Sequence, residues 1–349
     1  MQPAFSAIVC CHNSAKRLKE TLGHLAAQQV PASLGWEVVL VDNGSTDDTV
    51  AMALALWPRG NSAPLRVVAE PRLGLSFARK RGFAEAHGEI VCFVDDDNWV
   101  AADWASVAVD VMRRIPTAGA CGGQSQAACE VPPPAWFDSH KAWFAVGEQG
   151  EQAGDVTDSR GHFWGAGLVI RRSAMARLQN RGFTAQLIGR QGGALSSGED
   201  SELCFALRLA GWRLYYEPRL RFQHFLPSAR LNWAYLRRSH RGFGRGKPVL
   251  ALYQKALQAP EIADAPSEHW ARHAAWVLRA VLAEDRRILW RFRSPLEANP
   301  QVLAAERRLG HLQGLLNLRG RLASIEEDLR RAAWRDPQVV PAARATGRA

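Results

Sequence analysis

The stretch Gly88–Asn98, GEIVCFVDDDN, contains the strongest fold signal in the chain. Its apolar run Ile90–Val94 is typical of a strand that is buried on both faces, and the run ends in three aspartates. Three adjacent carboxylates repel one another, so we expect them to serve a ligand. Alternation along an extended chain points Asp95 and Asp97 to the same side, where one or both could bind Mg²⁺ or Mn²⁺ beside a substrate phosphate. The alternative is a solvated acidic turn.

Strands and helices alternate before this stretch. Apolar runs at Phe5–Cys11, Trp36–Val41 and Leu65–Ala69 indicate strands, and a helix-like pattern follows each of them. This rhythm predicts an α/β fold whose mostly parallel sheet has helices on both faces. Such sheets bind ligands at the carboxyl ends of their strands. The polar residues at those ends are therefore expected to meet in one crevice: His12, Asn13, Asp42, Asp95, Asp96 and Asp97.

Each polar group at the first two strand ends has a functional and a local interpretation. Asp42 can accept hydrogen bonds from a nucleotide base or a ribose, or it can close its strand with an Asx turn. His12 and Asn13 can border the base, and Asn13 or Ser14 can instead cap the following helix. Both interpretations stay open at this point.

A basic cluster, Arg79–Arg81, lies on the helix predicted over Leu73–His87. Successive helical side chains point about 100° apart, so at most one or two of the three face the crevice. An arginine facing inward, such as Arg79, would offset the charge of a diphosphate. The alternative is a solvated helix face.

An acidic pair, Glu199 and Asp200, follows the Gly-rich loop Gly189–Gly198 and opens another helix. A carboxylate placed beside a hydroxyl can act as a general base and take its proton. Carboxylates also stabilise a helix N-terminus through its dipole, and that is the alternative role.

Composition limits the class of protein. The chain has 349 residues, of which 47% are hydrophobic and 22% charged, which indicates a globular protein of two domains or of one domain with an appendage. No uninterrupted apolar run reaches the roughly 18 residues of a spanning helix, and the first residues lack a signal-peptide pattern. None of the six cysteines forms a CxxC pair, which is typical of free thiols in a reducing cytosol.

The net charge of +10 favours an anionic partner in general. Most of the surplus is local, because residues 206–260 hold 11 of the lysines and arginines and a single acid, Glu217. This segment follows Glu199 and Asp200 directly. Its position fits a diphosphate, a lipid-pyrophosphate acceptor or an anionic membrane surface better than it fits a generic polyanion.

The C-terminal third has a helical pattern. An apolar stripe with tryptophans over residues 268–293 predicts a helix that either packs on the preceding domain or lies at a membrane interface. We expect a first domain over residues 1–231, a helical region over 232–335 and a disordered tail over 336–349.

Six segments, in this order, resemble the family 2 glycosyltransferases, which have the GT-A fold. They are CCHN (10–13), VDNGSTDDT (41–49), ARKRG (78–82), GEIVCFVDDDN (88–98), WGAGLVIRRSAM (164–175) and GEDSELCFALRLAGWRLYYEP (198–218). The resemblance covers roughly residues 4–226. The chain departs from the family where CCHN replaces the commoner Pro and Tyr before Asn, and where ARKRG replaces ARNxG.

The resemblance implies a role for each cluster. Asp95 and Asp97 would form the DxD motif, with Asp97 on the metal and Asp95 nearer the ribose or the sugar. Asp200 would deprotonate the acceptor hydroxyl, with Glu199 in support. His224 would lie near the metal or the diphosphate. The donor residues would be His12, Asn13, Asp42, Arg79, Asp95 and Asp96, and Trp164 and Gly165 would line the acceptor side.

These implications combine into one expected activity. A cytoplasmic glycosyltransferase of class EC 2.4, assisted by Mn²⁺ or Mg²⁺, would move a sugar from a nucleotide sugar, expected to be a UDP-sugar, with inversion. Its acceptor would be a saccharide or a lipid-linked hydroxyl, as in bacterial cell-envelope polysaccharide synthesis. It would have no nucleic-acid partner, and peripheral contact with an anionic membrane would involve 206–260 and 268–293. The alternatives are a metal-dependent nucleotidyltransferase and a basic nucleic-acid-binding protein.

Overall fold

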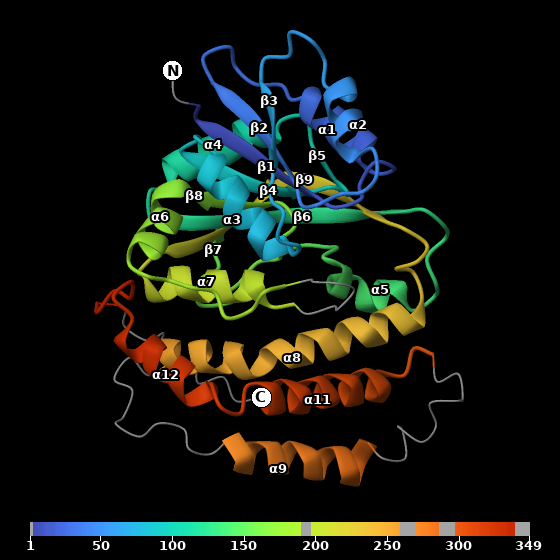
Figure 1. The fold of residues 1–349 in the computed structure, drawn as a ribbon, viewed down its shortest axis with the longest axis vertical. Coiled ribbons are helices and arrows are strands. Elements are labelled where there is room, and N and C mark those ends of the chain that lie inside the picture. The colour runs from blue at the N-terminus through green and yellow to red at the C-terminus, as the bar shows by residue number, and fades with distance from the viewer. Residues whose placement is uncertain (1–2, 190–196, 259–269, 286–296, 339–349) are drawn as a thin grey trace.

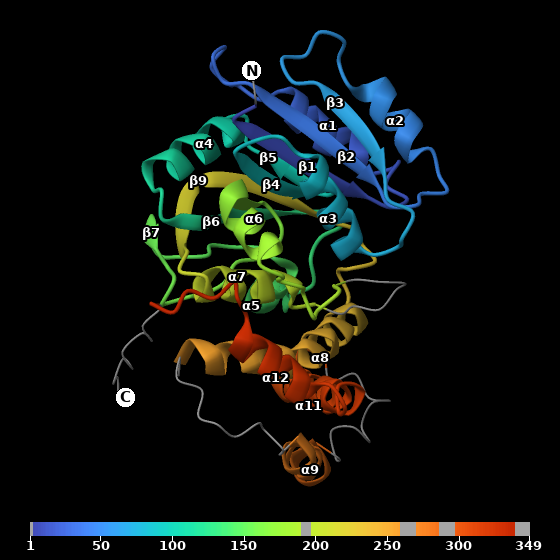
Figure 2. The same ribbon diagram turned by 60° about the vertical axis from the view of Figure 1, so that its left-hand side comes forward.

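A computed structural model describes residues 3–189, 197–258, 270–285 and 297–338 of the chain. A mixed sheet with helices on both faces forms the upper part of Figure 1, and a stack of long helices lies beneath it. Figure 2 shows the two parts from a second direction. This arrangement confirms the expected α/β fold with a helical C-terminal extension.

The sheet has nine strands in the order β3-β2-β1-β4-β8-β6-β9-β5, with β7 paired to β9. Its strands are β1 (Phe5–Cys11), β2 (Trp36–Asp42), β3 (Leu65–Ala69), β4 (Ile90–Asp95), β5 (Asn98–Val100), β6 (Ala118–Cys129), β7 (Gly154–Asp155), β8 (Leu168–Arg171) and β9 (Arg213–Leu226). The first four strands are the predicted ones, and they run parallel. In their register Cys11 lies beside Asp42, and Cys10 beside Asp95, so the polar strand ends do share one edge.

Helices cover both faces of the sheet because its strands are buried on both sides. The flanking helices are α1 (Leu18–Ala26), α2 (Thr49–Leu56), α3 (Leu75–Glu85), α4 (Trp104–Arg114), α6 (Arg172–Asn180) and α7 (Glu199–Leu209). One buried cluster joins α1, α2 and α4 to one face, and a second joins α3, α6 and α7 to the other. The short helices α5 (Phe137–His140) and η1 (Lys141–Phe144) precede β7. The carboxyl ends of β1, β2 and β4 lie side by side at the edge described below.

The far half of the sheet differs from the simplest sequence interpretation. The segments 212–216 and 220–225 look like two short strands, but they form one continuous strand, β9, which pairs with β6 along its length. The pairing of β6 with β9 shifts register between Gly122, which pairs with Tyr216, and Gln124, which pairs with Arg221. The strand β6 is rich in Gly and Ala and lacks a strand-like pattern. It needs Gly123, because a Cβ there would lie 2.0 Å from the carbonyl oxygen of Leu220.

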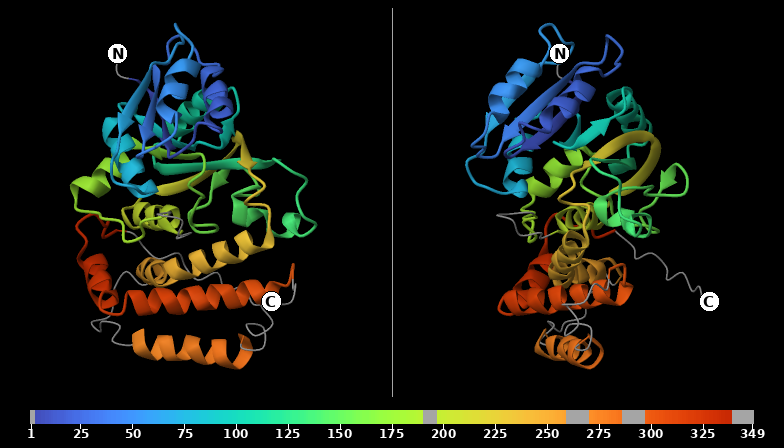
Figure 3. Two further views of the ribbon diagram at one scale, coloured as in Figure 1. Left: turned by 45° about the vertical axis from the view of Figure 1, so that its right-hand side comes forward. Right: turned by 90° about the vertical axis from the view of Figure 1, so that its right-hand side faces the viewer.

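The helical region is a stack formed by α8 (Trp233–Gln258), α9 (Trp270–Ala280), its continuation η2 (Val281–Asp285), α11 (Pro300–Asn317) and α12 (Leu322–Arg331). Figure 3 shows α8, α11 and α9 in successive layers. Glycines bring α8 and α11 close together, since a Cβ on Gly310 would lie 2.0 Å from the Arg241 carbonyl oxygen. Buried Glu306 of α11 accepts hydrogen bonds from Arg237 and Arg241 of α8, at 2.9 and 2.6 Å. Close packing and an ion pair therefore hold α8 and α11 together.

Replacing Gly310 with Ala is expected to lower the free energy of unfolding by about 2 kcal/mol, because the new methyl group forces α8 and α11 apart. Gly23 is the matched control, since it lies inside α1 with no atom within 4 Å of an added Cβ. Gly23→Ala should raise the free energy of unfolding by about 0.5–1 kcal/mol. Urea unfolding of both variants measures the difference. Equal effects at the two positions would contradict the close contact.

The helix α9 and its continuation η2 pack on α11 through Ala274, Val277 and Val281, while Trp276 on the opposite side of α9 is 66% exposed. No helix among the described residues is long and apolar enough to cross a membrane. The predicted helix over 268–293 extends into segments outside the described residues, as does most of the tail predicted over 336–349.

Most basic side chains of the expected patch over residues 206–260 form ion pairs within the protein. Eight of its 11 basic side chains form ion pairs, and these are Arg208, Arg213, Arg219, Arg221, Arg230, Arg237, Arg241 and Lys255. Apart from Glu217, which pairs with Arg219, the acidic partners come from distant parts of the chain, so most of these arginines and lysines connect separate elements.

Candidate active site

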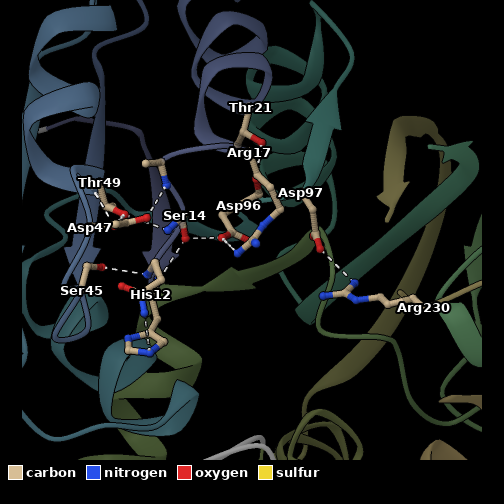
Figure 4. A network of polar contacts seen from close by, with 12 residues as sticks. His12, Ser14, Arg17, Thr21, Ser45, Asp47, Thr49, Asp96, Asp97 and Arg230 are labelled. Carbon is tan, nitrogen blue, oxygen red and sulfur yellow. Dashed lines mark hydrogen bonds and ion pairs between the residues drawn. The ribbon is translucent and has the colours of Figure 1, made fainter. Parts of the chain in front are cut away.

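Each of the three adjacent aspartates is paired with a different arginine. Arg79 of α3 lies 3.5 Å from Asp95, and Arg17, just before α1, lies 2.6 Å from Asp96. The third pair joins Asp97 to Arg230, at 3.0 Å, on the turn between β9 and α8. Figure 4 shows the second and third pairs. The arginines come from three separate elements and converge on one strand end.

These pairs explain how three adjacent carboxylates are accommodated. The side chains of Asp95, Asp96 and Asp97 are only 29%, 14% and 4% exposed, so the interpretation as a solvated acidic turn is wrong. Burial raises the pKa of Asp95 and of Asp96, and the nearby guanidinium of Arg79 or Arg17 acts against that rise. The arginines therefore offset a charge that desolvation and mutual repulsion disfavour.

Arg79 also binds Asp200 and so links the two acidic clusters. Its Nη1 donates to Oδ1 of Asp200, and its guanidinium lies 5.3 Å from the centre of the Phe93 ring. Burial disfavours the charged guanidinium, but Asp200 and Asp95 outweigh it and raise the pKa of Arg79. On the same helix Lys80 is exposed and Arg81 pairs with Glu85, so only Arg79 of the basic cluster enters the site.

Asp200 is held on its other side by the backbone. The N–H of Gly165 donates to Oδ2 of Asp200 at 2.8 Å. A Cβ at Gly165 would lie 2.2 Å from Oδ1 of the same carboxylate, so any larger residue would displace Asp200. Glu199 starts α7 beside it and lies against Gly189, where a Cβ would be 2.8 Å from Oε1. The Gly165 backbone and Arg79 thus fix the direction of the Asp200 side chain.

The residues at the first two strand ends mainly organise their own loops. One oxygen of Asp42 accepts from the N–H of Ser45 at 3.2 Å, which closes a local turn one residue longer than the Asx turn considered above. Oδ1 of Asn13 accepts from the N–H of Thr46 at 2.8 Å, so Asn13 ties the two loops together and does not cap its own helix. His12 is exposed, and its Nδ1 contacts the Asn43 carbonyl oxygen at 2.8 Å.

Asn43 is an organising residue that sequence reasoning missed. Its Nδ2 donates to the carbonyl oxygens of Glu70 and Arg72, at 2.9 and 2.7 Å. Its Oδ1 accepts from the N–H of Gly74 at 2.8 Å. Gly74 is the residue before α3, the helix that carries Arg79. The buried amide therefore sets where that helix begins. Its position after a strand in VDNGS is the signal that could have identified it.

Trp164 is half-buried and precedes Gly165, whose backbone holds Asp200. The backbone N–H of Trp164 donates to Oε1 of Gln149 at 2.8 Å, and the guanidinium of Arg160 lies 4.9 Å from the centre of the Trp164 ring. The residue follows directly after buried Phe163 and precedes Gly165. The ring therefore lies next to the residue whose backbone holds Asp200.

The residues around Asp97 can be compared with the ligands that a divalent metal ion requires. Nε2 of His224 lies 3.5 Å from Oδ1 of Asp97, and Nδ1 of His224 is buried without a hydrogen-bond partner. No group of three His, Cys, Asp or Glu side chains within the described ranges could hold a metal ion by itself. Mg²⁺ and Mn²⁺ commonly take one or two carboxylates and complete their shell with substrate phosphates and water. Asp97 with His224 fits that kind of partial site, and Asp95 is two residues before Asp97 on the same strand end.

Arg17 and Arg230 are the two site residues without an individual sequence prediction. Arg17 follows CCHNSAK, and Arg230 belongs to the basic surplus of residues 206–260. Ser14 also reaches the cluster, since its hydroxyl donates to Asp96. The position of Arg17 and Ser14 after the first strand is the signal that could have identified them, because that strand end faces the same crevice. Nothing local distinguishes Arg230 from the arginines around it.

Comparison with known proteins identifies the family and the fold. Residues 6–178 match the model of glycosyl transferase family 2. The chain is similar to the succinoglycan biosynthesis protein ExoM of Rhizobium meliloti (strain 1021). The two are 28% identical over 316 residues, which cover 88% of this chain and 92% of that protein.

Two solved structures share the fold. The mannosyltransferase PcManGT from Pyrobaculum calidifontis, in complex with GDP-Man and Mn²⁺, has a TM-score of 0.56 at 20% identity, covering 92% of this chain and 88% of its own. S. aureus TarS 1-349, in complex with UDP-GlcNAc, has a TM-score of 0.52 at 18% identity, covering 94% and 91%. The fold is that of a GT-A glycosyltransferase. Residues 6–178 of this chain are a family 2 glycosyltransferase domain.

Proposed function

We propose that this enzyme moves a sugar from a UDP-sugar to a hydroxyl of a saccharide or lipid-linked acceptor in a single inverting displacement. The observation that carries the proposal is the position of Asp200, which Arg79 and the Gly165 N–H hold beside the aspartates of the strand edge. A carboxylate fixed in this way can serve as a general base beside a donor bound at that edge.

The donor would lie across the carboxyl ends of β1, β2 and β4. Asp42 would bind the base or the ribose, and His12 and Asn13 would border the base. Asp95 and Asp96 would face the ribose or the sugar, and Arg79 would lie near the diphosphate. Support comes from the shared strand edge and from structural neighbours whose complexes hold GDP-Man and UDP-GlcNAc.

A divalent cation, Mn²⁺ or Mg²⁺, would be held by Asp97, Asp95 and His224 together with the diphosphate. When bound, it would neutralise the charge that develops on the departing diphosphate. The PcManGT complex contains Mn²⁺, which supports manganese as the first ion to test.

In the reaction Asp200 would take the proton of the acceptor hydroxyl while that oxygen bonds to the anomeric carbon. The bond from that carbon to the diphosphate breaks on the opposite face, and the nucleoside diphosphate leaves with the bonding electrons. One base is sufficient for this displacement, and Glu199 would support it. Trp164 and Gly165 would line the acceptor side. The similarity to ExoM supports an acceptor in polysaccharide biosynthesis.

Peripheral membrane contact would bring such an enzyme to a lipid-linked acceptor. The exposed side of α9 and η2 supports it, since Trp276, Leu278 and Leu282 lie there beside Arg272 and Arg279. Helices that lie in the membrane interface carry Trp and Leu that enter the lipid and arginines that face its head groups. The basic segment 206–260 supports it less, because most of its charges are paired. The family match, rather than the charge, argues against a nucleic-acid-binding function.

The donor proposal is tested by the thermal stability of the protein with nucleoside diphosphates. UDP with Mn²⁺ at about 100 times its dissociation constant should raise the melting temperature by about 5 °C, because ligand binds only the folded state. EDTA should abolish most of that rise, and GDP with Mn²⁺ should give a smaller one. Mn²⁺ alone is the control. No stabilisation by any nucleoside diphosphate with Mn²⁺ would contradict the proposed donor class.

A further inference from the structure

Arg230 forms an ion pair with Asp97, the carboxylate that is proposed to bind the metal ion. Its guanidinium lies 3.0 Å from Oδ2 of Asp97, and the two side chains are only 22% and 4% exposed. Oδ1 of Asp97 faces His224 at 3.5 Å. Each oxygen of Asp97 therefore faces a basic group, as Figure 4 shows for Arg230. The pKa of Arg230 is raised, because its attraction to Asp97 outweighs the opposing effect of burial.

A divalent cation on Asp97 and the guanidinium of Arg230 cannot share this place favourably. Both are positive, and the surroundings are too buried for water to screen their repulsion. Entry of a cation alone would cost the ion pair and leave Arg230 beside a larger positive charge. A nucleoside diphosphate changes this balance, since its phosphates offer Arg230 new negative partners near the same carboxylate.

The other two arginines of the cluster are held more firmly. Arg79 has Asp200 as a second partner, and the strand end that Arg17 contacts is tied to α1 through Thr21, whose hydroxyl donates to the Asp96 carbonyl oxygen at 2.9 Å. In the described part of the chain, the side chain of Arg230 forms one ion pair, and its partner is Asp97. Its backbone is anchored in a turn, where its N–H donates to the Pro227 carbonyl oxygen at 2.8 Å. The side chain can therefore turn away while its turn stays in place.

We propose that Arg230 is a built-in counter-ion that keeps Asp97 from binding metal until a nucleoside diphosphate is present. The inference rests on the proposed metal-assisted function. It makes the binding of metal and nucleotide cooperative, because each favours release of Arg230 from Asp97. Thermodynamic linkage then requires that UDP tighten Mn²⁺ by the same factor as Mn²⁺ tightens UDP.

The test measures Mn²⁺ binding by electron paramagnetic resonance, with and without UDP, in the full chain. The variants are Arg230→Gln, Arg230→Lys and, as matched control, Arg238→Gln on the exposed side of α8. Without UDP, Arg230→Gln should bind Mn²⁺ about tenfold more tightly than wild type, and the tightening by UDP should fall by at least the same factor. Arg230→Lys should lie between the two, and Arg238→Gln should match wild type.

The outcomes separate this inference from the proposed function. If wild type binds Mn²⁺ with UDP but Arg230→Gln leaves Mn²⁺ binding without UDP unchanged or weaker, the counter-ion role is wrong. If wild type binds neither Mn²⁺ nor UDP, the proposed function itself fails. Should Arg230→Gln not fold, Arg230→Lys decides, because it retains the charge but not the geometry of the guanidinium. Tighter binding of Mn²⁺ alone by that variant supports the role, and unchanged binding overturns it.

Discussion

Asp200→Asn is expected to lower the rate of sugar transfer by about a thousandfold, because an amide cannot take the proton of the acceptor hydroxyl. Asparagine has nearly the shape of aspartate, and its carbonyl oxygen can still accept from the Gly165 N–H. Donor binding should therefore stay within about threefold of wild type, since the contacts proposed for the donor involve other side chains.

Two measurements on the same preparation test this expectation. Release of UDP in the presence of acceptor reports transfer, and stabilisation by the UDP-sugar with Mn²⁺ reports donor binding. The matched control is Asp328→Asn, which removes a carboxylate from the exposed side of α12. Near-normal transfer by Asp200→Asn would mean that Asp200 is not the base, and Glu199 would be the next residue to replace.

Arg79→Met is expected to reduce both stability and transfer. It leaves Asp95 and Asp200 close together without their shared cation, and it should lower the free energy of unfolding by about 2 kcal/mol. The loss stays below that for a fully buried pair because these two carboxylates remain 29% and 25% exposed. Transfer should fall at least about a hundredfold, because Asp200 loses the contact that directs it.

Lys80→Met provides the control for Arg79→Met, since it removes a positive charge at the next position of α3 from an exposed side chain. It should leave transfer and stability close to wild type. Urea unfolding gives the free energies, and UDP release gives the rates. Arg79→Lys should recover part of the stability but little of the rate, because an ammonium cannot span the two carboxylates as a guanidinium does. Transfer at the wild-type rate by Arg79→Met would contradict the role of Arg79 in directing Asp200.

The parallel half of the sheet was predictable because its signals are local. Runs of apolar residues with helices between them require parallel strands, and parallel strands end at a common edge. The sequence therefore predicted that Asp42 and Asp95 would lie on one edge, and their strands are neighbours of β1. The paired strands β6 and β9 were not predictable in the same way. The Gly- and Ala-rich strand β6 has no pattern of its own, and its strand structure depends on pairing with β9.

The sequence alone determined which carboxylates this enzyme brings to its strand edge. Only the tertiary structure decided which cations meet them, because the partners are far apart in the chain. Arg17 and Asp96 are 79 residues apart, Arg79 and Asp200 are 121 apart, and Arg230 and Asp97 are 133 apart. Periodicity and helix or strand propensity act over a few residues, whereas ion pairing and burial act through space. The basic surplus after Asp200 therefore looked like one surface in the sequence, and the fold distributes it over separate ion pairs.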